Sequence, residues 1–365
     1  MTCRGGTTLF VLLLAGCGMD QDGEIDRIFA DYRGAEAPGA VVRVIRDGAP
    51  VATRTYGLAN VEEKIPVRPQ TNFRLASVTK QFTAMSILIL VDRGELGLDD
   101  TLTDIFPEFP EYGDGVTLRH VLQHTSGLID YEPFVAEDSE KQILDREVLA
   151  LMMQQDHTYF PPGTEHRYSN SGYAVLATVV ENVSRRSFAD FLSENIFEPL
   201  GMHDTVAHEE GVSVVANRAY GYHVGETGVE FSDQSPWSAV LGDGGVYTSV
   251  TDLAKWDQAL YDNPFVRPEL LAEAFTPGLE DYGFGWRIDE YRGHRRMHHD
   301  GSTIGFRNFM QRFPDERLTV IVLTNRREPE VQSLAERVAD LYLPQAPVGA
   351  HVGRGRVEPP DFQGW

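Results

Sequence analysis

The segment FRLASVTKQFTAM, residues 73–85, places Ser77 and Lys80 three residues apart at the start of an apolar run with helical spacing. Side chains three residues apart on a helix share a face, so the hydroxyl and the amine can meet. A helix N-terminus also offers N–H groups and a positive dipole end, which would stabilise a negative oxygen beside Ser77. Apolar neighbours would desolvate Lys80 and favour a neutral amine that accepts the serine proton, making Ser77 a nucleophile.

The same pair also fits a structural role, in which Ser77 caps the helix and Lys80 points into water. The chain has only four lysines, but a serine and a lysine at this spacing also arise by chance. The pair alone therefore leaves both interpretations open, and other motifs must decide between them.

A second candidate element is FPPGTEHRYSNSGYAVLA, in which Tyr168 and Asn170 lie two residues apart just before an apolar helix. In an extended segment, residues i and i+2 point to the same side, so a phenol and a carboxamide would project together. The phenol can relay protons to Ser77 or to a leaving group, and the amide can hold a substrate carbonyl or N–H group. The structural alternative is a packed tyrosine and an asparagine that caps the helix.

A third candidate element is RRMHHDGSTIGF, in which we expect a strand to end at His299 and the next to begin near Phe306. An edge strand bearing His299 is placed to bind the carboxylate or carbonyl side of a substrate. Gly301 would let a ligand approach the backbone, and the Ser302 N–H could join the Ser77 N–H in an oxyanion hole. The alternative is a surface histidine in a hairpin loop.

The 11 histidines raise the alternative of a metal site. His120 and His124 are four residues apart on a predicted helix, and His298 and His299 are adjacent. Neither pair has a carboxylate at ligand spacing, and no His-Glu-x-x-His motif is present, so we expect His124 to hydrogen-bond the HTSG turn instead. The glycine pair in GDGGVY, residues 242–247, lacks the lysine of a phosphate-binding loop. We therefore expect neither a metal nor a cofactor.

The elements that must position these residues fall into two kinds. Strands are predicted around an Asp47-Gly48 hairpin turn and again in YGFGWRI, RRMHH, FRNFMQRF and RLTVIVLTN near the C-terminus. Helical periodicity marks the ranges 25–33, 77–93, 171–184, 249–264 and 331–343. From about residue 100 to 240 the sequence reads as mostly short helices and Gly/Pro-rich loops.

This order predicts a mixed α and β fold, in which N- and C-terminal strands pair into one antiparallel sheet flanked by helices. A mostly helical subdomain, about 100–240, is inserted between them. A cleft would lie where the sheet edge meets this insert. The domain spans 25–343, and a Pro/Gly-rich tail follows over 344–365.

The N-terminal stretch MTCRGGTTLFVLLLAGC reads as a secretory signal. Its apolar core, Leu9–Ala15, is shorter than the roughly 20 residues that cross a bilayer. LAGC resembles the cleavage box of bacterial lipoproteins, which implies a signal peptide over 1–16, lipid on Cys17 and a tether over 17–24. The protein would then be exported and anchored to a bacterial membrane, on its periplasmic or extracellular face. A plain signal peptide cut elsewhere and a short buried strand are the alternatives.

The charge balance excludes one class of partner. The chain carries 55 Asp and Glu against 32 Lys and Arg, a net charge of −23, and no basic stripe offsets it. Such a surface repels the phosphates of nucleic acids, so a nucleic-acid role is excluded and the expected partner is a small-molecule or peptide substrate.

Taken together and in this order, the three elements resemble the serine β-lactamase and penicillin-binding-protein superfamily, most closely its class C, D-aminopeptidase and esterase branch. LRHVLQHTSGL, GDGGVYTSVTDLAKW and YGFGW add to the match, which covers about residues 25–343. The resemblance implies a β-lactamase-like fold and hydrolysis through an acyl-enzyme, without metal or cofactor. Ser77 would be the acylated nucleophile, Lys80 its proton acceptor and Tyr168 a second acid and base.

In the same resemblance, Asn170 would contact the substrate, and His299, Gly301 and Ser302 would line the opposite wall. One departure bears on the substrate, because β-lactamases and cell-wall peptidases of this superfamily usually carry lysine where this chain has His299. A histidine is only partly charged near neutral pH and anchors a carboxylate less firmly. The departure favours esters, or amides and peptides that lack that carboxylate.

Two other functions remain open. One is a catalytically silent envelope protein that keeps the fold to bind peptidoglycan or partner peptides. The other is a true β-lactamase or D-Ala-D-Ala carboxypeptidase, which would act in or against cell-wall chemistry. The sequence does not fix the oligomeric state.

Overall fold

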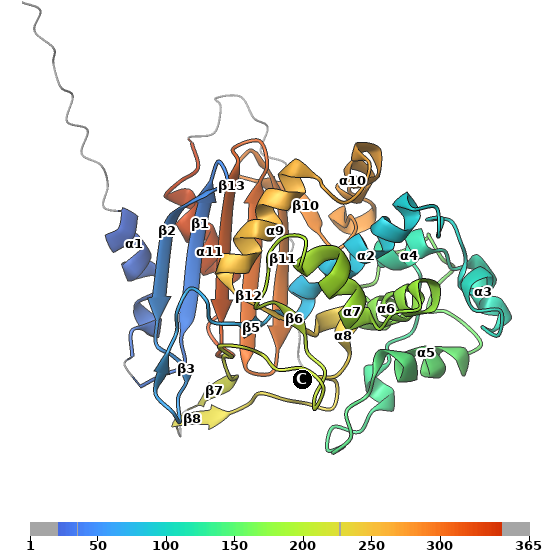
Figure 1. Cartoon of the computed structure of the whole chain (residues 1–365), viewed down its shortest axis with the longest axis horizontal. Helices are drawn as coiled ribbons and strands as arrows, with labels where there is room; N and C mark the ends of the chain where they lie inside the picture. The colour runs from blue at the N-terminus through green and yellow to red at the C-terminus, as the bar shows by residue number, and fades with distance from the viewer. Residues whose placement is uncertain (1–20, 35, 226–227, 345–365) are drawn as a thin grey trace, which may run out of the picture.

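The central element of the fold is one antiparallel sheet to which both ends of the chain contribute. A computed structural model describes residues 21–34, 36–225 and 228–344 (Figure 1). Six strands lie in the order β10-β11-β12-β13-β1-β2, so the first two strands of the sheet in sequence extend the last four. Their bounds are Ala40–Arg46 (β1), Ala49–Tyr56 (β2), Arg287–Tyr291 (β10), His294–Thr303 (β11), Phe306–Phe313 (β12) and Leu318–Thr324 (β13). The predicted mixed α and β architecture is confirmed.

The two faces of this sheet carry separate apolar cores, because successive residues of a strand point to opposite sides. Along β13, Leu318, Val320 and Val322 pack in the core beside α1 and α11. Ile321 and Leu323 belong to the larger core on the other face. All residues of β13 are buried, as a central strand covered on both faces requires. The larger core ties the sheet to the helices that carry the candidate site.

Helices cover both faces of the sheet and build the inserted part, which lies to the right of the sheet in Figure 1. Helices α1 and α11 contact one face, and α9 contacts β1 and β13 from the other. Helix α6 packs against α2, α4, α5 and α8. The bounds are Gln21–Ile28 (α1), Lys80–Asp92 (α2), Leu102–Ile105 (α3), Leu118–Leu122 (α4), Asp145–Met153 (α5), Asn170–Ser184 (α6), Phe188–Leu192 (α7), Leu241–Gly244 (α8), Val250–Asp262 (α9), Pro268–Ala274 (α10) and Gln332–Asp340 (α11).

Short strands join the inserted part to the sheet. A three-stranded sheet has the order β5-β9-β6, and two hairpin-like pairs, β3-β4 and β7-β8, flank it. The β7-β8 pair lies within the region predicted as helices and loops. The bounds are Leu58–Asn60 (β3), Ile65–Pro66 (β4), Phe73–Arg74 (β5), Val206–Ala207 (β6), Tyr222–Gly225 (β7), Gly228–Phe231 (β8) and Val246–Thr248 (β9).

Two predicted boundaries near the N-terminus need correction. The helix predicted over 25–33 begins at Gln21, so part of the predicted tether is helical. Asp22 and Glu24 lie in its first turn, where the positive end of the helix dipole favours acidic side chains. The remaining turn is a separate 3-10 segment, Ala30–Tyr32. The predicted signal peptide and Cys17 lie outside the described residues, so the lipid attachment stays a prediction.

Two strand predictions near the C-terminus also need correction. The strand predicted to end at His299 continues to Thr303, because its backbone stays paired with β12 through Asp300, Gly301 and Ser302. The strand predicted in YGFGWRI begins only at Arg287. The positive φ of Gly285, 75°, breaks an extended conformation just before it.

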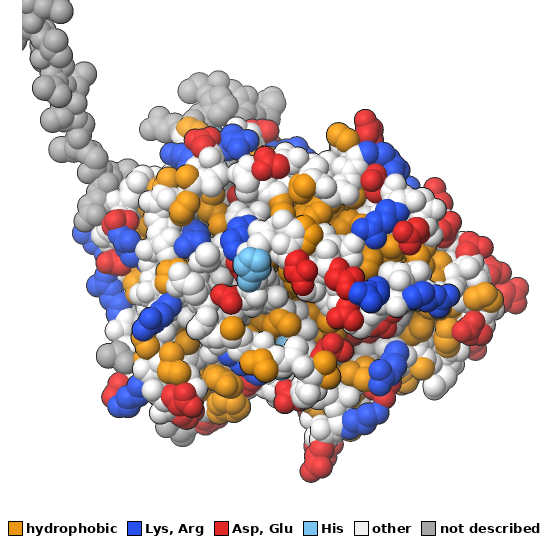
Figure 2. Space-filling model, in the orientation of Figure 1, with side chains coloured by type: hydrophobic (Ala, Val, Ile, Leu, Met, Phe, Trp, Pro, Cys, Tyr) orange, Lys and Arg blue, Asp and Glu red, His pale blue; other side chains and the backbone are white. Residues whose placement is uncertain are grey.

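The surface is mixed, with acidic side chains concentrated over the helical part. Figure 2 shows Asp and Glu side chains gathered at its right-hand edge, in the region of α3. Among the described residues, no helix combines the length and the apolar character needed to cross a membrane.

Gly301 provides a test of how tightly β11 must approach the turn that carries Ser77. A Cβ atom at this position would lie 2.1 Å from the Leu75 carbonyl oxygen, which forces the strand and the turn apart. We expect Gly301→Ala to lower the free energy of unfolding by about 1–3 kcal/mol and to reduce activity, because overpacked sites relax by moving backbone. Gly115→Ala is the matched control, since its Cβ would meet only a side-chain atom of Pro162 at 3.8 Å. Urea unfolding of both variants tests this expected loss of stability, and equal unfolding midpoints would contradict it.

Candidate active site

Ser77 lies in a 3-10 turn, Ala76–Thr79, directly before α2 and not on the helix as predicted from the sequence. The turn is held in place by the Leu75 N–H, which donates to the Val246 carbonyl at 2.8 Å. Ala76 has a positive φ of 50°, a conformation that an L-residue keeps only when its surroundings impose it. Ser77 itself is half-buried.

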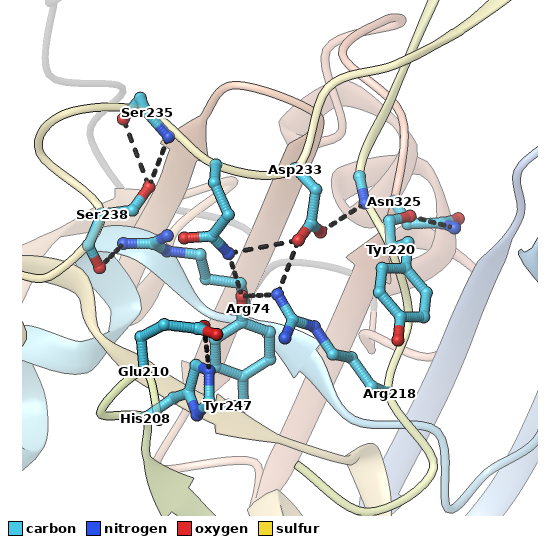
Figure 3. Close-up of polar contacts among 12 residues, drawn as sticks. Arg74, His208, Glu210, Arg218, Tyr220, Asp233, Ser235, Ser238, Tyr247 and Asn325 are labelled. Atoms are coloured by element: carbon cyan, nitrogen blue, oxygen red, sulfur yellow. Dashed lines mark hydrogen bonds and ion pairs between the residues drawn. The ribbon is translucent and has the colours of Figure 1, made fainter. Parts of the chain in front are cut away.

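The turn has a second anchor at Arg74, the residue before Leu75. The Arg74 guanidinium donates to the Ser238 carbonyl at 2.8 Å (Figure 3), and the Arg74 carbonyl accepts from Asn308 of β12 at 2.8 Å. These bonds connect β5, just before the serine turn, with both the sheet and the loop that leads to α8. The serine turn therefore lies between the sheet and the helical part.

Lys80 is the first residue of α2, and its side chain is completely buried. Its Nζ atom lies 3.2 Å from the Ser77 Oγ atom, 2.8 Å from the Asn170 Oδ1 atom and 2.8 Å from the Asp243 carbonyl oxygen. The last two atoms can only accept hydrogen bonds. A neutral amine would donate its two N–H groups to them and turn its lone pair toward the serine hydroxyl.

The orientation of the Asn170 amide follows from its other partner. The Nδ2 atom of Asn170 donates to the Glu132 Oε1 atom at 2.8 Å, so the Oδ1 atom must face Lys80. Asn170 also begins α6, where Ser169 caps the helix by accepting from the Gly172 N–H at 3.1 Å. The cap that starts the helix thus aims the amide at the amine.

Burial changes the acidity of the lysine. Desolvation lowers the pKa of Lys80 to about 8, while the charges of Asp243, Glu132 and Asp300 oppose the shift. A lysine with this pKa is partly neutral near physiological pH. It also lies against two aromatic rings, with Nζ 4.9 Å from the Tyr168 centroid and 5.4 Å from the Tyr173 centroid.

The Tyr168 hydroxyl is buried and has no conventional hydrogen-bond partner. Burial raises the pKa of this phenol well above 10, Asp300 adds to the rise, and the nearby Ser77 hydroxyl opposes it. Tyr168 therefore remains protonated where Lys80 already titrates. Of the two groups beside the serine, the lysine is therefore the one that can accept a proton at neutral pH and the phenol the one that can donate one.

His299 lies on β11 beyond the end of β10, so it is on an open edge of the sheet, and it is buried at 1% exposure. Its Nδ1 atom is 2.6 Å from the Asp300 carbonyl, which fixes the proton on Nδ1. Its Nε2 atom then accepts from the Tyr282 hydroxyl at 2.8 Å. Burial lowers the pKa of His299 to about 3. The side chain is neutral and not the surface residue of the structural alternative.

Gly301 and Ser302 follow His299 on the same strand. The Gly301 backbone packs against the serine turn, close to Leu75 and Val78, and Ser302 is exposed. The structure thus brings Ser77, Lys80, Tyr168 and Asn170 into one contact group, and places the strand with His299, Gly301 and Ser302 beside the turn.

His124 is a residue of this site that the sequence analysis assigned to a different contact. We expected it to bond the HTSG turn, but its Nδ1 atom accepts from the Ser169 N–H at 3.1 Å, and its carbonyl accepts from the Arg167 N–H at 2.9 Å. These two bonds clamp the backbone on both sides of Tyr168. Its ring stacks at 4.2 Å from the Tyr168 ring, between centroids.

Glu132, Asp243 and Tyr282 are further members that the sequence analysis did not single out. Glu132 contacts Asn170, Asp243 contacts Lys80 and Tyr282 contacts His299. Each of these contacts joins separate segments of the chain, so no local spacing indicates it. GDGG and YGFGW, which contain Asp243 and Tyr282, contributed to the family resemblance, whereas the stretch around Glu132 did not. Within the described residues, no group of three or more His, Cys, Asp and Glu side chains is arranged to hold a metal ion.

The neutral state of His299 can be measured directly. Because its pKa is lowered to about 3, the ring should stay uncharged between pH 5 and 8, with the proton on Nδ1. Nitrogen NMR of ¹⁵N-histidine-labelled protein, with His299→Gln to assign the signal, should show no titration in this range. A midpoint near 6.5, the ordinary value for histidine, would contradict the geometry described for its two ring nitrogens.

Comparison with known proteins identifies the family of the chain. A family model described as Beta-lactamase matches residues 25–343. The chain is 36% identical to penicillin-binding protein 4* of Bacillus subtilis, over 75% of this chain and 65% of that protein. It is 29% identical to a D-aminopeptidase of Brucella anthropi, over 81% of this chain and 57% of that protein. The chain thus spans less than two thirds of the length of both relatives.

A solved structure is similar in the same way. The D-amino acid amidase of Ochrobactrum anthropi SV3, solved in complex with L-phenylalanine amide, superposes with a TM-score of 0.75 at 25% identity. The superposition covers 88% of this chain and 98% of that structure. The family match extends over most of the chain and includes the serine turn, the Tyr168 segment and β11. The chain belongs to the beta-lactamase family.

Proposed function

We propose that the chain is a serine hydrolase that cleaves amide, peptide or ester bonds through an acyl-enzyme on Ser77. The observation that carries the proposal is the Lys80 amine, buried, depressed in pKa and held by two acceptors so that its lone pair faces the serine hydroxyl. Relatives named as D-aminopeptidase and D-amino acid amidase support a hydrolase of amides. No metal or cofactor takes part in this mechanism.

The proposed reaction balances with these groups alone. The Ser77 Oγ atom attacks the substrate carbonyl carbon while its proton moves to the Lys80 amine. The Tyr168 O–H then protonates the leaving nitrogen or oxygen and regains a proton from the Lys80 ammonium. In the second half, water attacks the acyl carbon while one of its protons moves to the neutral Lys80 amine. The bond between the acyl carbon and the Ser77 Oγ atom then breaks, the Oγ atom takes that proton from Lys80, and the acid product leaves.

The charges around the serine suggest which substrates fit. His299 is neutral, Asp300 follows it on the strand, and Glu132 lies behind Asn170, so carboxylates outnumber fixed cations next to Lys80. A substrate carboxylate would be repelled there, and a protonated amine would be attracted. We therefore propose substrates with a free ammonium group near the scissile bond, as in amino-acid amides and N-terminal residues of peptides.

Arg287 favours the second candidate, a β-lactamase or D-Ala-D-Ala carboxypeptidase. Its guanidinium lies 5.6 Å from the centroid of the Tyr282 ring, and its charge acts on His299, Asp300 and Tyr168. A substrate carboxylate that bound this arginine would meet a cation despite the neutral histidine. A turnover panel must therefore include D-Ala-D-Ala peptides and a cephalosporin beside amides and short-chain esters.

Loss of either member of the nucleophile pair tests the mechanism. We expect Ser77→Ala and Lys80→Arg to lower kcat/KM for a neutral ester by on the order of 10⁴-fold, because arginine stays charged and cannot accept the proton. In the wild type, kcat/KM for this ester should rise with pH through about 8, as Lys80 loses its proton.

The fold is checked by circular dichroism and by the unfolding midpoint of each variant. A fluorophosphonate probe should label the wild type and not Ser77→Ala. A silent peptide-binding protein would give no label that depends on Ser77, and near-normal turnover by Lys80→Arg would contradict the role of the lysine.

Glu132→Gln tests the preference for a free ammonium group. Glutamine still accepts from the Asn170 amide, so the variant removes charge and keeps the geometry. At pH 7 we expect the ratio of kcat/KM for a D-amino-acid amide to that for its N-acetyl derivative to fall about 10-fold, as expected for an ion pair worth about 1.4 kcal/mol, because any change in the pKa of Lys80 affects both substrates alike. Equal losses for both substrates would contradict the proposed ammonium contact, and a wild type that prefers D-Ala-D-Ala peptides would favour the second candidate.

A further inference from the structure

Asp145 has a buried carboxyl group that the proposed mechanism does not use. It lies at the start of α5, and its two oxygens accept from the N–H groups of Leu241 and Gly242 at 2.8 and 2.9 Å. The next residue, Asp243, supplies the carbonyl that accepts from Lys80. Burial raises the pKa of Asp145 to about 8 although both N–H bonds oppose the rise, so the chain keeps a costly group at this point.

Thr83 holds the same segment from the other side. Its hydroxyl donates to the Gly242 carbonyl at 2.7 Å, and it lies on α2, three residues after Lys80. Gly242 has no room for a side chain, because a Cβ atom there would lie 2.3 Å from the Tyr173 carbonyl oxygen of α6. The segment is thus held between α2, α5 and α6.

Arg74 holds the chain just before this segment, since its guanidinium donates to the Ser238 carbonyl (Figure 3). The GDGG motif therefore has a structural reason for each of its first two residues. Gly242 permits contact with α6, and Asp243 presents its backbone to Lys80 and its carboxylate to the Tyr131 hydroxyl at 3.1 Å. The GDGG motif, which the sequence analysis had separated from phosphate-binding loops, thus lies against the Lys80 side chain.

We propose that Asp145 and Thr83 are positioning residues that hold the Asp243 carbonyl against the Lys80 amine and thereby set its proton affinity. The inference rests on the proposed function, because it assigns these residues to the activation of Ser77. A carbonyl that accepts from an ammonium group stabilises the charged form. When the carbonyl moves away, the pKa of Lys80 falls and the amine becomes a weaker base.

Asp145 acts on Lys80 through the segment, while its own charge acts on Asp243 and Tyr131. The carboxylates whose charges raise the pKa of Lys80 are Asp243, Glu132 and Asp300, and Asp145 is not one of them. The other titratable groups that surround the amine or act on the same cluster are Tyr168, Tyr173, His124 and His299. None of these bonds the 241–242 backbone through its side chain, so a variant of Asp145 leaves their contacts with Lys80 unchanged.

The test is the pH dependence of Ser77 labelling by a fluorophosphonate probe, which carries no titrating group. In Asp145→Asn, the new Nδ2 group faces one of the two N–H donors, and the segment loosens. In Thr83→Val, the Gly242 carbonyl loses its donor. For both variants we expect the apparent pKa of labelling to fall by about one unit from the wild-type value, and the plateau rate to fall several-fold because a weaker base removes the proton more slowly.

Matched controls separate positioning from general stability. Asp252→Asn removes a buried carboxylate that accepts from the Asp204 N–H at 3.3 Å, and Thr178→Val removes a buried hydroxyl that donates to the Val175 carbonyl at 2.7 Å. Both controls should lose stability without a shift of the labelling pKa. No shift in Thr83→Val or Asp145→Asn, or a shift upward, would overturn the inference.

The two proposals fail in different ways. If the wild type is not labelled at Ser77, the proposed function is wrong. If it is labelled but the two variants titrate like their controls, only the positioning role is wrong. Should Asp145→Asn not fold, Thr83→Val tests the same contact with a nearly isosteric change at a position where no charge is lost.

Discussion

The whole arrangement depends on keeping one amine out of water without leaving it unpaired. A buried ammonium group is costly unless acceptors surround it, and a buried neutral amine is costly unless its N–H groups are satisfied. Lys80 meets both demands with the same three neighbours, the hydroxyl of Ser77, the amide of Asn170 and the carbonyl of Asp243. The two states of the amine are therefore close in free energy, which is what a base near neutral pH requires.

Each of these neighbours comes from a different part of the chain, and the fold supplies each with a separate reason to stay in place. The helix cap at Ser169 and the carboxylate of Glu132 orient Asn170. Packing of Gly301 on the serine turn fixes the distance between β11 and Ser77. The buried histidines of the site, His124 and His299, serve as neutral hydrogen-bonding groups and bring no charge to the pocket.

Sequence patterns predicted the architecture well, because the strands and helices that matter have strong periodicity. The strand FRNFMQRF matches β12, and the Asp47-Gly48 turn joins β1 to β2 with positive φ at both residues. The pairing of terminal strands followed from their positions in the chain. The patterns misjudged the end of β11, since pairing with β12 carries the strand past His299 through residues with weak strand preference.

The site itself was predictable only in part. Ser77, Lys80, Tyr168 and Asn170 have local spacing that chemistry can recognise, and resemblance to a family added the rest. The contacts that complete their surroundings span long stretches of sequence: Lys80 bonds Asn170 across 90 residues and the Asp243 carbonyl across 163. Burial of the His299 ring likewise depends on packing that no spacing reveals. One-dimensional patterns identify reactive groups, but not the environment that makes them reactive.

The pairing of β1 with β13 has a consequence for how the chain folds during its synthesis. Val42 and Val322 are register partners, so the sheet is incomplete until nearly the whole chain has been synthesised. Contacts of such long sequence separation form late, because loop closure must be completed before they stabilise anything. The serine turn packs against β11 and is bonded to β12 through Arg74. A partly synthesised chain would therefore contain Ser77 without these contacts. The candidate site would thus be complete only after the C-terminal strands have joined the sheet.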